Sequence, residues 1–212
     1  MLRFDRSQQG LAIGISALAG FVDALGFVES SGFFVSFMTG NSTRLAVGVA
    51  EGTRAGLVAG AIILLFVGGV VTGALVGARF AAHRARAVLA LVTALLAAAT
   101  ALRFAALPTP AIACLAVAMG AVNAALQGRD GSVVGVTYMT GTLVQMGQKM
   151  ANRLRGSGDG RWMPHLLLWA GLVLGAVAGA STVLRAPAIG YALAVAFAAA
   201  LTLRAAANGE AA

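Results

Sequence analysis

Six long apolar stretches constrain this chain more than any other feature of its sequence. A helix that crosses the hydrocarbon core of a bilayer needs about 20 predominantly apolar residues, and each stretch reaches or approaches that length. Only 10% of the residues are charged, against about 25% in a typical soluble domain, so a water-facing surface of ordinary polarity cannot be built. The sequence therefore predicts an all-α membrane protein with about six transmembrane helices, expected at residues 10–28, 57–78, 87–107, 110–127, 163–184 and 186–205.

The net charge of +8 does not predict nucleic-acid binding. The basic residues gather at the ends of the apolar stretches and in the connectors between them, which is where the positive-inside rule places them. We therefore expect the lipid bilayer and a small-molecule solute as partners, and no nucleic acid. The two basic clusters are Arg79, Arg84 and Arg86, and then Lys149, Arg153, Arg155 and Arg161.

The chain repeats itself with an offset of about one hundred residues, a pattern that indicates duplication. The stretch GFVDA at Gly20–Ala24 matches GAVNA at Gly120–Ala124, and VSFMTG at Val35–Gly40 matches VTYMTG at Val136–Gly141. A glycine row follows in each copy, and small residues in a row permit close helix packing. We expect the two rows to pack against each other or, as the lesser option, to form the seam of a homodimer. The rows are Gly69, Gly73 and Gly77, and Gly171, Gly175 and Gly179.

These matches divide a single integral membrane domain, residues 1–212, into repeat halves at 9–107 and 110–206. Each half has four apolar segments, and the second segment carries the MTG motif. If all four crossed, the two basic clusters would face opposite sides. If the MTG segment instead enters and returns on one side, the halves are inverted and both clusters, with the N- and C-termini, are cytoplasmic. In a competing arrangement the MTG segment spans as a broken helix while another segment fails to cross.

Each MTG motif places a small polar group inside an apolar stretch. Gly favours a break in a helix, and Asn, Ser and Thr are good caps for a helix that restarts. Non-helical backbone at membrane depth needs protein or a watered cavity to satisfy it, and half-helix N-termini at the midplane hold anionic groups in many transporters. The alternative to a binding site is a structural role, in which these polar residues only make contacts between neighbouring membrane helices. We predict a substrate-binding site formed by Thr39, Gly40, Asn41, Ser42, Thr43, Arg44, Asn123, Thr140, Gly141, Thr142 and Gln145.

Two ionisable residues sharpen this prediction. Asp23 lies inside the first apolar stretch, where a charge is costly and is usually paired or functional, and Arg44 directly follows the first motif. In one reading they form an ion pair that only neutralises both. In the other, Arg44 attracts an anionic or carbonyl-bearing substrate and Asp23 exchanges a proton. The matching residues of the second half are the neutral amides Asn123 and Gln145.

No cofactor, metal site or enzymatic activity is predicted. His83 and His165 lie near connectors without partners at ligand spacing, and the sequence has no HExxH or G-x-S-x-G motif. Phe37 and Tyr138, which precede the two MTG motifs, line a cavity in one interpretation and only pack in the other.

The stretches GFVDALGF and FVSFMTGNST, followed by a glycine-rich helix, resemble the YoaK-type bacterial integral membrane proteins, a family known as a domain of unknown function. The resemblance covers most of the chain and is most specific at Phe37–Asn41. It implies a multi-pass protein of the bacterial inner (cytoplasmic) membrane with six or so helices, and no established substrate. From the residues themselves we predict a small secondary transporter; the alternatives are a channel of the same fold and a non-transporting scaffold or accessory subunit.

Overall fold

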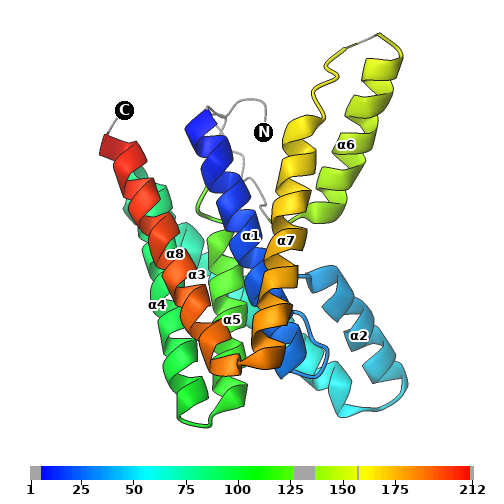
Figure 1. Cartoon of the computed structure of the whole chain (residues 1–212). Coiled ribbons are helices and arrows are strands. Elements are labelled where there is room, and N and C mark those ends of the chain that lie inside the picture. Colours follow the sequence, from blue (N-terminus) through cyan, green and yellow to red (C-terminus); the bar gives the residue numbers. More distant parts are fainter. Residues whose placement is uncertain (1–5, 127–136, 157, 211–212) are drawn as a thin grey trace.

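The computed structural model describes residues 6–126, 137–156 and 158–210, and within them every regular element is helical (Figure 1). The all-α prediction is therefore confirmed. The elements are α1 (Arg6–Glu29), α2 (Met38–Ala50), α3 (Arg54–Arg79), the short 3-10 helix η1 (Ala81–His83), α4 (Arg84–Phe104), α5 (Pro108–Val122), α6 (Met139–Leu154), α7 (Met163–Arg185) and α8 (Pro187–Glu210).

Five helices in the described part of the chain are long and apolar enough to cross a membrane, namely α1, α3, α4 with η1, α7 and α8. The one remaining expected segment, predicted at residues 110–127, corresponds to the shorter apolar helix α5, which has 15 residues. Its first turn contains Pro108 and Pro110, a position that proline tolerates because the first backbone N–H groups have no helical acceptor. The chain is thus a multi-pass membrane protein.

The centre of the bundle is formed by α1 and α5. In the most apolar stretch of α1, a share of 61% is buried inside the bundle, whereas in the corresponding stretches of the other four spans this share is between 22% and 33%. In α5 the side chains of Leu115, Met119 and Val122 are fully enclosed. The outer helices instead expose large apolar side chains such as Leu64 and Leu174, as expected where the surroundings are lipid.

The central helix α1 packs against α7 through glycines. Gly175 and Gly179 of α7 lie directly against the backbone carbonyl groups of Ala17 and Phe21, and Gly20 of α1 lies against the backbone of α7. Any side chain at these glycines would collide with backbone atoms of the partner helix. The paired residue numbers rise together, so α1 and α7 run parallel.

The second central helix, α5, packs against α3 in the same way. Gly69 and Gly73 lie against the backbone of Val117 and Ala121, and Gly120 lies against the backbone of α3. The expectation that the two glycine rows pack against each other is therefore wrong. Each row packs instead on the small-residue face of the first helix of the other half, because two backbones approach most closely where both surfaces are small.

Both glycine rows are buried inside one chain. A homodimer stays a prediction, and its interface would have to use other faces.

The helices α2 and α6 begin near the middle of the bundle and run to opposite ends (Figure 1). They have 13 and 16 residues, so at about 1.5 Å per residue neither covers the roughly 30 Å of a hydrocarbon core. Helix α1 begins and α8 ends at the same end of the bundle, and both basic connectors lie there too. At the other end, Arg103 Nε donates to Glu29 Oε2 over 2.6 Å, so these two charges neutralise each other.

Candidate functional site

The first MTG motif begins a helix rather than interrupting one. After α1 the chain turns at Ser31 and Gly32, which have φ angles of 58° and 108°, and continues without regular structure to Phe37, the residue before α2. No side chain caps α2, so the expected capping role of Asn, Ser and Thr is wrong at this helix. The helix starts before these residues, at Met38, and they lie inside its first two turns.

Two side chains hold the non-helical segment in place. The Asn41 amide donates to the Phe34 carbonyl over 2.6 Å and accepts from the Phe34 N–H over 3.1 Å. Asp23 Oδ1 accepts from the N–H groups of Val35 and Ser36 over 2.8 and 2.7 Å. Backbone that has left helical structure inside an apolar bundle needs such partners, so Asn41 and Asp23 act as its anchors.

The second MTG motif has a related but simpler arrangement. Asn123, which matches Asp23, donates to the Met119 carbonyl over 2.9 Å, and its Oδ1 accepts from the Thr137 hydroxyl over 2.9 Å. Tyr138 precedes α6, which again lacks a side-chain cap. Because Val136 lies outside the described residues, the match to Val136–Gly141 is described only from Thr137 onward.

The glycine of each motif accommodates an aromatic ring. A Cβ at Gly40 would meet the Phe37 ring at 2.6 Å, and one at Gly141 would collide with the Tyr138 ring. In each case the ring belongs to the residue three positions earlier and folds back over the first turn of the helix. This contact explains why an aromatic residue and a glycine recur at the same spacing.

A cavity of about 950 Å³ lies where α2 and α6 begin, and residues from both MTG segments line it. Of the predicted site residues, six reach its wall: Thr39, Asn123, Thr140, Gly141, Thr142 and Gln145. Its wall also includes Ser36 and Thr137, the two rings of Phe37 and Tyr138, and an apolar side formed by Phe66, Val70 and Leu168.

The backbone at this cavity offers hydrogen-bond donors. Within the described part of the chain, the N–H groups of Thr39 in α2, and of Thr140 and Gly141 in α6, have no acceptor. These are the unsatisfied first-turn donors of a helix, which carry partial positive charge.

The remaining predicted site residues do not line the cavity. Asn41 is fully buried, and the hydroxyl groups of Ser42 and Thr43 donate to carbonyl groups of their own helix. The guanidinium of Arg44 lies 5.1 Å from the centre of the Phe33 ring. Asp23 and Arg44 therefore do not form the ion pair that the sequence left open, and neither faces the cavity.

The sequence did not single out His165 as a site residue. It lies in the first turn of α7, is 4% exposed and lines the cavity, and among the described residues its imidazole has no hydrogen-bond partner. A lone histidine after a proline carries no signal by itself; the packing of α7 against α6 brings it to the site.

The family described as "Protein of unknown function (DUF1275)" matches residues 11–206. The chain belongs to this family. It is 40% identical over 183 residues to the UPF0700 transmembrane protein RA0705 of Rhizobium meliloti (strain 1021), an alignment that covers 85% of this chain and 79% of that protein. No solved structure matches the chain. The expected membership of an uncharacterised membrane family is thus confirmed.

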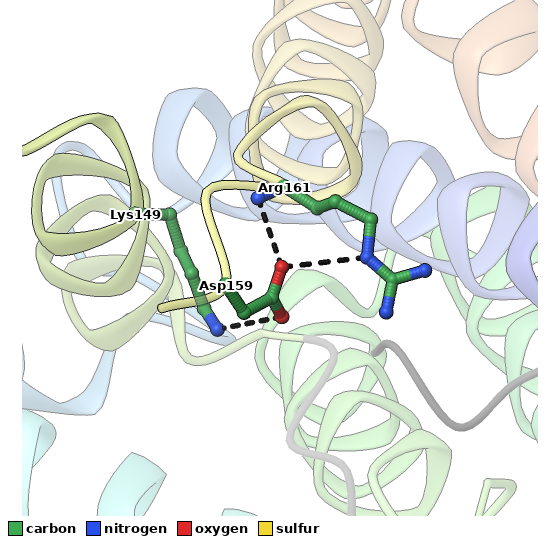
Figure 2. A network of polar contacts seen from close by, with 3 residues as sticks. All are labelled: Lys149, Asp159 and Arg161. Atoms are coloured by element: carbon green, nitrogen blue, oxygen red, sulfur yellow. Dashed lines mark hydrogen bonds and ion pairs between the residues drawn. The ribbon is translucent and has the colours of Figure 1, made fainter. Parts of the chain in front are cut away.

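In this DUF1275 chain an ion-pair cluster fastens the far end of α6 to the start of α7 (Figure 2). Lys149 Nζ lies 2.9 Å from Asp159 Oδ2, and the Arg161 backbone N–H and Nε lie 3.0 and 3.3 Å from Asp159 Oδ1. The hydrogen bond from Lys149 is the main cause that lowers the pKa of Asp159 to about 2. The carboxylate therefore stays charged through the physiological range and can keep both ion pairs.

Proposed function

We propose that this protein is a small secondary transporter of the bacterial inner membrane for a small anionic or carbonyl-bearing solute. The observation that carries the proposal is the convergence of two half-length helices, whose N-terminal turns line one cavity of about 950 Å³. Helix N-termini that meet in this way at the middle of a membrane are a recurrent means of holding anionic groups in transporters.

The chemistry of the cavity favours a hydrogen-bond acceptor. The backbone N–H groups at Thr39 and Thr140, which have no acceptor in the described part of the chain, and the amide of Gln145 supply donors, while Phe66 and Leu168 form an apolar wall. A small oxyanion or carbonyl group, attached to a modest apolar body, matches this combination of convergent donors and apolar surface.

The arrangement of α2 and α6 supports a transport cycle. Neither helix is long enough to span, and in α6 no residue is fully buried, whereas α1 and α5 form a tightly packed centre. We infer that the halves 9–107 and 110–206 are inverted repeats, and that movement of α2 and α6 against the centre exposes the cavity to each side in turn.

Coupling to protons through Asp23 remains a prediction. The Asp23 carboxylate faces the backbone N–H groups of Val35 and Ser36, which favours a role in positioning the segment that leads into the cavity.

Flux measurements on the full chain in proteoliposomes test the proposal. Uptake of labelled formate, acetate and lactate should be saturable, should be accelerated by the unlabelled solute inside, and should fall at least about tenfold in Gln145→Ala, which removes a cavity donor worth about 1.4 kcal/mol or more. Ser42→Ala is the matched control, because that hydroxyl is exposed and bonds its own helix. Flux without this acceleration would indicate a channel, and no flux of any solute would favour the scaffold alternative.

A further inference from the structure

We propose that the cavity binds a small monoanion together with a proton, and that His165 is the residue that receives the proton. This inference rests on the proposed function and assigns the coupling group to α7 instead of to Asp23.

The position of His165 points to a ligand. Its side chain is nearly fully buried, lines the cavity and has no hydrogen-bond partner in the described part of the chain. A neutral imidazole that lines a cavity can donate from one ring nitrogen and accept at the other. An occupant of the cavity that carries an acceptor would therefore meet a donor at His165.

The charge around the cavity limits the occupant to one negative charge. The residues of its described wall include no lysine, arginine, aspartate or glutamate. The N-termini of α2 and α6 each contribute about half a positive charge, which together balance roughly one anionic charge.

The proton and the anion should favour each other. An anion beside the ring favours the imidazolium over the neutral imidazole. A neutral imidazole offers one donor and one acceptor, whereas the imidazolium offers two donors. The loaded cavity would therefore hold the anion paired with the imidazolium, beside the partial positive charges of the two helix N-termini.

The charged groups on the elements packed against α7 do not replace the solute as a counter-ion. On α1, Asp23 accepts from backbone N–H groups and Glu29 pairs with Arg103. In the connector that precedes α7, Asp159 already forms ion pairs with Lys149 and Arg161. The other titratable groups on these elements are Arg6 on α1, Tyr138, Lys149, Arg153 and Arg155 at α6, Arg161 in the connector, Arg185 on α7 itself, and Tyr191, Arg204 and Glu210 on α8, where Glu210 is the last residue of the helix.

Calorimetry with the purified full chain tests the inference. Formate, acetate, lactate, nitrate and chloride are titrated in two buffers of different ionisation enthalpy, which gives the number of protons taken up per anion. In the wild type we expect about one proton per bound anion at neutral pH, and an affinity that falls about tenfold for each pH unit above the range of the histidine. In His165→Gln the binding that remains should be weaker, independent of pH and free of proton uptake.

The chain offers a matched control in His83, the only other histidine, which is exposed in η1. His83→Gln should behave as the wild type does. Proton uptake that persists in His165→Gln, or that is lost in Asp23→Asn instead, would overturn the inference while leaving the transporter proposal intact. Binding by the wild type without any proton uptake would overturn it as well, even if His165→Gln fails to fold. Absence of binding and flux for all five anions would reject the transporter proposal itself.

Discussion

At the scale of single residues, the polar side chains of the first motif divide into those that hold a neighbouring segment of backbone and those that do not. Asn41 makes two hydrogen bonds with Phe34 and is fully buried. Its neighbour Ser42 is exposed and bonds only its own helix. A difference of one position along the helix therefore separates an anchor from a surface residue.

This division predicts different effects for two similar truncations. Asn41→Ala leaves the Phe34 N–H and carbonyl without partners, so it should lower the free energy of unfolding by about 1–3 kcal/mol. Ser42→Ala should change it by less than about 0.5 kcal/mol. Thermal denaturation in detergent, followed by tryptophan fluorescence, measures both. Equal stability of the two variants would contradict the anchoring role of Asn41.

The sequence predicted part of the site for a physical reason. Thr39, Thr140 and Gln145 reach the cavity because both MTG segments begin helices that point their first turns at it. Arg44 does not, because the helix starts at Met38 and its turn carries Arg44 toward Phe33. His165 was missed because nothing near it in the sequence marks a site.

At the scale of helices, the glycine rows show what a sequence match can and cannot give. The rows were recognised from spacing alone, and they do mediate close packing. Their register differs from the sequence match: Gly69 was matched to Gly171, yet its contact with α5 corresponds to that of Gly175 with α1, one helical turn further on. Sequence spacing repeats every turn, so it cannot distinguish one turn from the next.

Two adjacent glycines of α3 provide a test of this packing. Gly69 lies against the backbone of Val117, whereas Gly68 faces open space. Gly69→Val should separate α3 from α5 and cost about 2 kcal/mol or more, seen as loss of the monodisperse peak in size-exclusion chromatography after mild heating. Gly68→Val changes the same helix by the same side chain and should keep that peak. Loss of the peak in both variants would mean that helix propensity, rather than contact, decides the outcome.

At the scale of the whole molecule, the basic connectors, the start of α1 and the end of α8 lie at one end of the bundle. The loop between α2 and α3 lies at the other end (Figure 1). The charge pattern of the sequence predicted that grouping, because the positive-inside rule acts on connectors whatever the helices do between them. It could not predict which helices pair in the centre, since that depends on contacts between distant segments.

Thiol labelling tests the membrane sides. Single cysteines are placed in a Cys114→Ala background at the exposed positions Thr53, His83 and Arg155. In intact spheroplasts, a membrane-impermeant maleimide should label Thr53→Cys, whereas His83→Cys and Arg155→Cys should react only after permeabilisation. Labelling of Thr53→Cys and Arg155→Cys from the same side would exclude entry of α2 and α6 from opposite sides.

Because α7 packs on α1 and α3 packs on α5, each glycine row depends on a helix of the other half. This arrangement affects how the chain is assembled during synthesis. Helix α1 leaves the ribosome first, yet the helix whose glycines fit it, α7, begins only at Met163. Until then the backbone of α1 at Ala17 and Phe21 lacks the glycines that cover it in the folded protein. A nascent chain stopped after α4 would have inserted α1 and α3 with neither partner, so half of the coding sequence does not encode half of a stable protein.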